Sequence, residues 1–319
     1  MWLGAFLIGT TLNPLEWSIM KRVICAFSLT ALSTTAAPAA AQQQPTPEQA
    51  AERERQYQQE LATPNPIEPL NSVWIEELTW LEVRDRIADG YTTAIIPTGG
   101  IEQNGPYLAT GKHNVILEAL CPAIAEKLGN ALCAPIVAFV PEGGIDPPTG
   151  AMRYPGTIAV RDETYVALLE DIGGSLGAHG FTDIVYIGDS GGNQTGMADA
   201  AARLNERWAG SGRTAHFVRE FYSPGWEETE RYTEEVLGVA EGEHDGYHDD
   251  MWVTAFMAVV DPETVRWDQR VAAGLASING VSLVPLQRTI ELGERIVDFR
   301  AEYTVRAIRE VIARAHQGR

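Results

Sequence analysis

Strand-like and helix-like segments alternate along most of this chain, and the alternation limits the folds it can adopt. Two short runs are apolar throughout or nearly so, Thr92–Pro97 and Ile184–Ile187, as expected of strands buried on both faces of a sheet. A third strand is expected over Ala134–Val140. Segments with helical spacing of apolar residues accompany them: Ile75–Asp89, Asn114–Leu128, Thr164–Ala178, Thr195–Trp208 and Ile290–Ala315. The pattern predicts an α/β domain whose mainly parallel sheet has helices on both faces.

The charge balance argues against some classes of partner. The 319 residues carry 24 Lys and Arg against 43 Asp and Glu, a formal net charge of -19, and no basic run interrupts this excess. A nucleic-acid backbone or an anionic membrane surface would be repelled by such a chain. We therefore expect no nucleic-acid partner.

The N-terminal region is typical of an export signal. From Met20 a basic pair, Lys21 and Arg22, precedes an apolar stretch and a run of small residues that ends at Ala41. Residues 1–19 lack this layout, so we take Met20 as the true start. Cleavage after Ala41 predicts a periplasmic or secreted protein with no stable membrane insertion. A single-pass anchor is the alternative, and Ser and Thr within the apolar stretch argue against it.

The mature chain divides by composition into a leader and a main domain. Residues 42–70 are rich in Gln, Glu and Pro, with one short helix expected over Pro47–Leu61, and residues 71–319 form the main domain. The three cysteines lack the CxxC spacing of a zinc or redox site. Cys121 and Cys133 would pair in an exported chain or remain two buried thiols.

Chemically useful side chains gather in Gly-rich loops. The loop after the first strand carries a carboxylate, two amides and an imidazole: Glu102, Gln103, Asn104 and His113. Two later loops, 188–196 and 242–251, add further acids and histidines together with Ser190. Open α/β sheets usually bind ligands at the carboxyl ends of their strands, so these loops are the candidate site.

Four motifs in these loops occur in the order and spacing of a known family. They are EQNGPYLATGKH (102–113), YPGTI (154–158), GGN (191–193) and HDGYHDD (244–250). The chain thereby resembles the creatininase (creatinine amidohydrolase) family over nearly all of its mature length. The resemblance implies a three-layer α/β/α fold, metal-dependent hydrolysis of amide C–N bonds in small molecules, and a homo-oligomer such as a hexamer.

The first loop departs from the family pattern in a way that bears on metal number. Glu102 matches the family Glu, but Asn104 stands where the family has a ligand His, and His113 stands where an Asp bridges two ions. A carboxylate has two oxygens for two cations, whereas a neutral imidazole binds only one. The sequence therefore predicts one divalent ion, Zn²⁺ or Mn²⁺.

The later motifs supply the remaining expected site residues. Asp189 and Ser190 replace the family Gly-His, Asp249 takes the place of a Glu, and His244 is retained. We expect Glu102, His113, Asp189 and Asp249 to be the metal ligands. His244 is expected to exchange a proton with the leaving nitrogen. His248 has no counterpart in the family pattern and receives no role.

Two other functions remain open from the sequence. The run from Gly188 to Gly192 fits G-x-S-x-G, which would make Ser190 the nucleophile of a metal-free serine hydrolase, with Asp249 and His316 as its partners. A non-catalytic binding protein would keep the pocket, with Trp226, Trp252 and Tyr247 as its lining. In that case the acids and histidines of residues 244–250 would merely cap helices. We favour an exported hydrolase of a small amide other than creatinine.

Overall fold

The computed structural model describes residues 46–317, and the chain divides into two units with the boundary after Ala62. In the first unit the described part is one exposed helix, α1 (Pro47–Leu61), which confirms the helix expected in the leader. Thr46 and Gln49 begin it with a capping box, in which each side chain accepts a hydrogen bond from the other residue's backbone N–H. The expected signal peptide lies outside the described residues.

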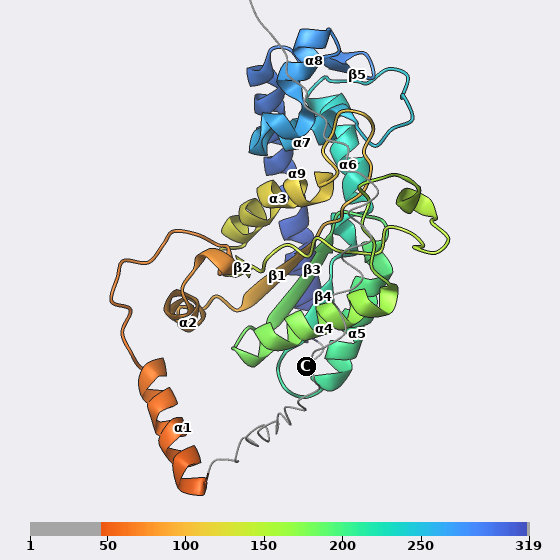
Figure 1. Cartoon of the computed structure of the whole chain (residues 1–319). Coiled ribbons are helices and arrows are strands. Elements are labelled where there is room, and N and C mark those ends of the chain that lie inside the picture. Colours follow the sequence, from red (N-terminus) through yellow and green to blue (C-terminus); the bar gives the residue numbers. More distant parts are fainter. Residues whose placement is uncertain (1–45, 318–319) are drawn as a thin grey trace, which may run out of the picture. The chain divides into compact units, whose positions relative to one another are not determined.

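A four-stranded parallel sheet lies at the centre of the second unit (Figure 1). Its strands, in spatial order, are β2 (Ala131–Cys133), β1 (Thr93–Thr98), β3 (Asp183–Gly188) and β4 (Thr214–Phe217). The register pairs Thr98 with Gly188, the last residues of β1 and β3. The loops that follow these two strands therefore start side by side.

Helices cover both faces of the sheet, which confirms the three-layer α/β/α fold. Ile95, Val185 and Ile187 point to one face, and their cluster includes residues of α3 (Lys112–Leu128), α7 (Met251–Val260) and α9 (Leu286–Gln317). The alternate residues of β1 and β3 pack on the other face. The helices there are α2 (Trp80–Ala88), α4 (Asp162–Ala178) and α5 (Asn193–Arg207). The alternation follows from the two-residue repeat of a strand.

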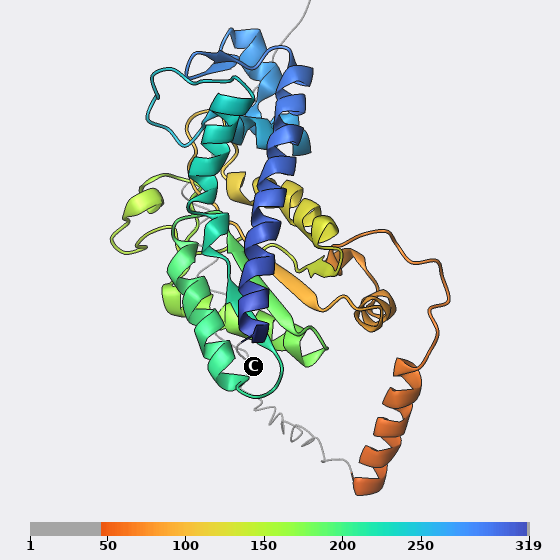
Figure 2. The ribbon, with the colours of Figure 1, turned by 180° about the vertical axis from the view of Figure 1, so that it is seen from behind.

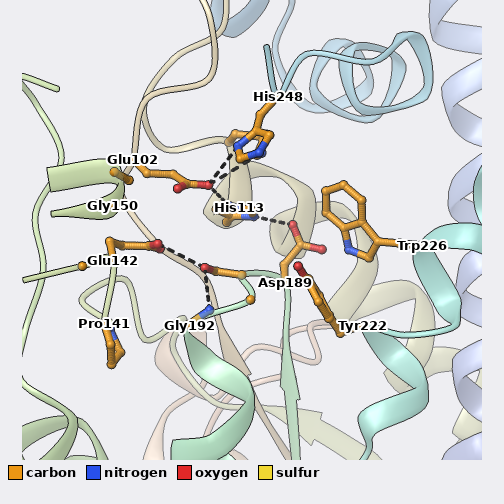
Figure 3. A pocket seen from close by; sticks show the side chains of 15 residues that line it. Glu102, His113, Pro141, Glu142, Gly150, Asp189, Gly192, Tyr222, Trp226 and His248 are labelled. Atoms are coloured by element: carbon orange, nitrogen blue, oxygen red, sulfur yellow. Dashed lines mark hydrogen bonds and ion pairs between the residues drawn. The ribbon is translucent and has the colours of Figure 1, made fainter. Parts of the chain in front are cut away.

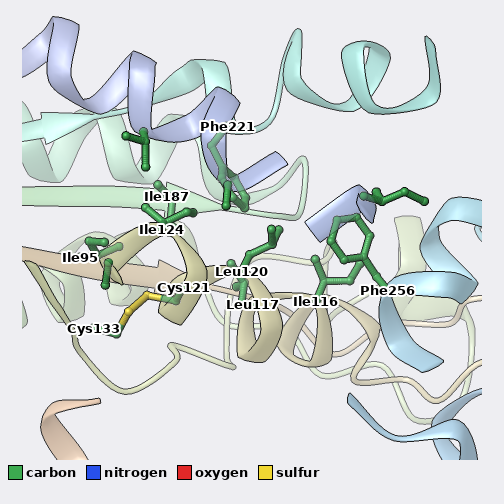
Figure 4. Packing of buried hydrophobic residues seen from close by; sticks show 14 of the residues in the cluster. Ile95, Ile116, Leu117, Leu120, Cys121, Ile124, Cys133, Ile187, Phe221 and Phe256 are labelled. Carbon is green, nitrogen blue, oxygen red and sulfur yellow. A yellow bond between two sulfur atoms is a disulfide. The ribbon is translucent and has the colours of Figure 1, made fainter. Parts of the chain in front are cut away.

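A disulfide joins α3 to the edge strand β2, on the face of the sheet that α3, α7 and α9 cover. Cys121 and Cys133 are both fully buried and are paired across 12 positions of sequence (Figure 4). Of the two sequence-based alternatives, the structure has the bridge. It ties the helix that begins with Lys112 and His113 to the edge of the sheet.

Two of the expected elements differ from those observed. The segment Ile75–Asp89 is not one helix, because Thr79 caps a new helix, α2, after the 3₁₀ turn η1 (Ile75–Glu77). The expected strand Ala134–Val140 is wrong: β2 ends at Cys133, and the residues beyond it form only isolated bridges. Pro135 has no N–H to donate to a sheet ladder, which accounts for the early end.

Besides α7, several elements between β4 and α9 were not expected from the sequence. They are η3 (Arg219–Phe221), α6 (Gly225–Arg231) with the π turn η4 (Tyr232–Val236), η5 (Pro262–Val265), α8 (Trp267–Ala273), β5 (Ser277–Ile278) and β6 (Val281–Ser282). The turn η2 (Gly150–Arg153) lies earlier, in the loop before α4. Among the described residues, no helix is long and apolar enough to cross a membrane.

The long helix α9 runs beside α6 (Figure 2). One buried side chain of α9, Arg300, holds η3 and α6 in place. The Arg300 guanidinium donates hydrogen bonds to the carbonyl oxygens of Phe221 and Gly225 and to Thr229 Oγ1. Tyr222 and Trp226 lie beside these anchored carbonyls in sequence. Burial lowers the pKa of Arg300 to about 10, so the guanidinium stays charged at neutral pH.

Candidate functional site

A cavity of about 410 Å³ lies where the loops after β1 and β3 meet the start of α3 (Figure 3). Its wall also includes the loop that follows Val140, the start of α6, and His248. The charged and polar side chains that line it are Glu102, Lys112, His113, Glu142, Asp189, Ser190, Tyr222 and His248. The cavity thus sits at the carboxyl ends of the parallel strands, where the sequence placed the candidate site.

His113 stands at the centre of the cavity wall between two carboxylates. It donates from Nδ1 to Asp189 Oδ2 and from Nε2 to Glu102 Oε1, each at 2.7 Å. Burial and the Lys112 ammonium act to lower the pKa of His113, but the two carboxylates outweigh them and raise it. The side-by-side ends of β1 and β3 explain the contact, because Asp189 follows β3 directly and Glu102 follows β1 within four residues.

Glu102 is the carboxylate shared by two histidines. Burial acts to raise its pKa, but the hydrogen bond from His113 and the nearby His248 ring hold the pKa well below the ordinary value of a glutamate. His248 Nδ1 lies 3.7 Å from Glu102 Oε1, and the His248 ring is largely exposed. The residue that received no role from the sequence therefore reaches the cavity.

Glu142 is a site residue that sequence reasoning missed. Its Oε2 accepts a hydrogen bond from Ser190 Oγ at 3.2 Å, while its Oε1 is buried and has no hydrogen-bond partner among residues 46–317. Burial, together with the charge of Glu102, raises the pKa of Glu142 to about 7. The available signal was its position: it follows the expected strand Ala134–Val140 and opens a Gly- and Pro-rich loop.

Gly100 allows Glu142 to approach the end of β1. A Cβ at position 100 would lie 2.1 Å from Glu142 Oε1, so a side chain there would collide with the carboxylate. The glycine is needed for this close approach.

Glu102, His113 and Glu142 are a group of side chains that could hold a metal ion. One ligand atom from each lies within 4.8 Å of the other two, and all three residues are buried. Two carboxylates and one imidazole suit Zn²⁺ or Mn²⁺. The partnerless Glu142 Oε1 supports the fit, because a buried carboxylate oxygen normally has a partner. Asp189, on the far nitrogen of His113, is placed to orient the imidazole rather than to bind the ion.

Asp249 and His244 do not line this cavity. The Asp249 side chain is fully buried beside the loop that contains Gly105, and within the described part of the chain neither of its carboxylate oxygens has a hydrogen-bond partner. Burial, assisted by the Asp245 carboxylate, raises the pKa of Asp249 to about 6. His244 is bonded to Asp250 at 2.8 Å and lines a separate cavity of about 140 Å³. The structure brings together Glu102, His113 and Asp189 from the expected ligand set, and leaves Asp249 apart.

The partners suggested for Ser190 are not beside it. His316 is bonded to Asp183 Oδ1 at 3.1 Å, and Asp183 begins β3 whereas Ser190 follows its end. Ser190 instead donates to Glu142, and both nitrogens of His113 are engaged by carboxylates. Of the aromatic residues suggested for a pocket, Trp226 lines the main cavity and Trp252 lines the smaller one.

Asn104, which replaces a family ligand, shapes the loop. Its amide Nδ2 donates to the carbonyl oxygens of Glu102 and Ala109, and the side chain is buried. The amide therefore closes the loop on itself and does not line the cavity.

Lys112 is the second site residue that sequence reasoning missed. Its side chain is almost fully buried at the first position of α3, with Nζ 3.9 Å from Glu102 Oε1. Nζ also lies 5.7 Å from the ring centroid of Trp226, within range of a cation–π contact. Burial lowers the pKa of Lys112, and the surrounding carboxylates oppose that change.

Comparisons with known proteins agree with the fold. A family model described as "Creatininase: Creatinine amidohydrolase" matches residues 76–308. A creatinine amidohydrolase of Pseudomonas putida is 30% identical over 116 residues, which are 36% of this chain and 44% of that protein. A mycofactocin precursor peptide peptidase of Mycolicibacterium smegmatis is 29% identical over 115 residues, 34% of this chain and 44% of the peptidase. The chain thus matches less than half the length of these relatives.

Solved structures resemble most of the chain. A structure described as "Creatininase Mn" superposes with a TM-score of 0.57 at 22% identity, covering 75% of this chain and 98% of the other. A mutant creatininase of the Zn-Zn type gives a TM-score of 0.57 at 21% identity, covering 76% and 98%. At these identities the likeness concerns the fold.

Proposed function

This chain belongs to the creatininase family, and on that premise we propose that it is a hydrolase of a C–N bond in a small amide that uses one divalent metal ion. The observation that carries the proposal is the buried set of Glu102, His113 and Glu142, whose ligand atoms converge within 4.8 Å of one another. The ion is Zn²⁺ or Mn²⁺, as the donor types favour. This set differs from the one expected from the sequence in two ways: Glu142 takes the place of Asp249, and Asp189 orients His113 instead of binding the ion.

The residues around the ligands have distinct roles in this proposal. A bound divalent ion would polarise the substrate carbonyl and stabilise the negative charge that develops on its oxygen. Asp189 accepts the Nδ1 proton of His113 and so fixes the orientation of the imidazole. Ser190 holds Glu142 by donating a hydrogen bond to its Oε2, which leaves Oε1 available to an ion.

We assign the proton for the leaving nitrogen to His248 rather than to His244. His248 lines the main cavity and remains exposed, so a substrate can reach its ring. His244 lies in the smaller cavity, where its ring is bonded to Asp250. A general acid must come within hydrogen-bond reach of the atom it protonates, which favours His248.

Removing the metal should lower the rate of hydrolysis much more than removing the Ser190 hydroxyl. We expect a chelator to abolish hydrolysis across a panel of small amides and lactams, and Zn²⁺ or Mn²⁺ to restore it. Ser190→Ala should lower kcat/KM by less than about tenfold, since it deletes one hydrogen bond to Glu142. Loss of turnover in Ser190→Ala alongside chelator resistance would establish the serine hydrolase. Absence of both metal and turnover would favour the binding protein.

We also propose that the protein is exported and acts in the periplasm or outside the cell. The buried disulfide between Cys121 and Cys133 supports this, because such bonds persist in oxidising compartments. Edman sequencing of the protein from its native host should find Gln42 at the N-terminus. A mature chain that starts well before Gln42 would contradict cleavage after Ala41. The homo-oligomer stays a prediction, to be measured by light scattering.

A further inference from the structure

We propose that Lys112 forms an anion-binding subsite in the main cavity, so that the substrate is an amide carrying a carboxylate. The substrate part of this inference rests on the proposed hydrolase function, whereas the subsite itself does not. The Lys112 side chain is 2% exposed and lines the cavity. Nothing in the family resemblance assigns this residue a role.

The Lys112 ammonium lacks the hydrogen bonds that a buried charge needs. It has three N–H donors, yet among residues 46–317 its closest carboxylate contact, to Glu102 Oε1, is 3.9 Å long. That distance exceeds the length of a charge-assisted hydrogen bond, about 2.7–2.9 Å. A buried ammonium without such bonds is costly, and an anionic acceptor in the cavity would relieve the cost.

The resident carboxylates near Lys112 are already committed to other groups. Glu102 and Asp189 each accept a short hydrogen bond from His113, and Glu142 accepts one from Ser190. Each of these acids is thus held in place by an existing hydrogen bond, and among the described residues only Glu102 Oε1, at 3.9 Å, comes near the ammonium. An anionic group of a ligand in the cavity can complete the coordination of the ammonium.

The surroundings of Lys112 favour an anion in two further respects. The Trp226 ring flanks the ammonium and packs edge-on against Trp252 at 4.6 Å, and an indole ring offers the ammonium no oxygen acceptor. The backbone of Gly191 and Gly192, at the N-terminus of the 15-residue helix α5, lines the same cavity. The positive end of a helix attracts an anionic group.

A pair of matched probes tests the subsite without turnover. N-acetylglycine carries a carboxylate beside its amide, and N-acetylglycinamide is its neutral equivalent of nearly equal size. By calorimetry on the full chain, we expect N-acetylglycine to bind at least about tenfold more tightly. Wild-type protein that binds both probes equally, or binds neither, overturns the proposal. This comparison needs no variant and so does not depend on how a substituted protein folds.

Variants then assign the preference to Lys112. Lys112→Met should weaken N-acetylglycine about tenfold and leave N-acetylglycinamide unchanged. Lys127→Met is the matched control: it removes the same charge from the other end of α3, where Lys127 pairs with Asp298. A preference that survives Lys112→Met, or that is lost equally in Lys127→Met, overturns the proposal. If the hydrolase function fails instead, the probe preference persists in a protein without metal-dependent turnover.

Discussion

Replacing Glu142 by glutamine is expected to abolish hydrolysis and to strip the protein of its metal ion. The change removes one of the two carboxylates in the three-residue ligand set, while the amide oxygen of Gln still accepts the hydrogen bond of Ser190. Loss of an outer partner of a metal ligand typically costs about 10- to 100-fold in affinity or activity, so loss of a ligand should exceed about 100-fold. The measurements are kcat/KM and metal content per chain.

The matched control for that variant is Asp249→Asn. Asp249 was expected from the sequence to be a ligand, yet its carboxylate is buried outside the cavity. The neutral amide fits a site where burial already raises the pKa of the acid to about 6. We expect this variant to retain its metal and most of its activity. Metal loss in Asp249→Asn but not in Glu142→Gln would refute the proposed ligand set.

Arg300→Met should lower the free energy of unfolding by about 3–5 kcal/mol, because each buried acceptor that loses its donor costs about 1–3 kcal/mol. The substitution leaves the carbonyl oxygens of Phe221 and Gly225 and the Thr229 hydroxyl without their shared donor. Because these groups hold η3 and α6, we also expect activity to fall with the loss of the cavity wall around Trp226. Urea unfolding measures the first effect, and kcat/KM the second.

Arg306→Met provides the comparison on the same helix. Arg306 is exposed on α9, and its guanidinium lies 5.8 Å from the ring centroid of Tyr303. Surface substitutions of this kind usually change stability by no more than about 0.5 kcal/mol. Equal destabilisation by the two variants would show that the buried bonds of Arg300 contribute little.

The sequence was sufficient to predict the strands and helices whose apolar residues follow a clear strand or helix pattern. β1 and β3 are apolar on both faces, and α3, α4 and α5 show clear helical spacing, so these elements agree with the expected ones to within a few residues. The same reasoning placed Glu102, His113 and Asp189 at one edge of the sheet. The shared register of β1 and β3 explains why this inference succeeded.

The rest of the site depends on contacts that no local pattern records. Glu142 and Ser190 meet across 48 positions of sequence, through a loop whose path follows from an interrupted strand. His248 and Asp249 are adjacent in sequence, yet only His248 lines the main cavity. In an irregular loop no repeat of apolar residues indicates which of two neighbouring side chains faces the cavity. In the sequence nothing distinguishes Lys112 from a solvent-exposed lysine at the start of a helix; its burial is seen only in the structure.

The most direct test of the account is the location of metal in crystals of the full chain, by anomalous scattering at the zinc and manganese absorption edges. The account predicts one divalent ion per chain, bound about 2.0–2.2 Å from Glu102, from His113 Nε2 and from Glu142. An ion held instead by Asp249 or His244, or a main cavity that binds no ion when crystals are soaked in Zn²⁺ and Mn²⁺, would contradict it.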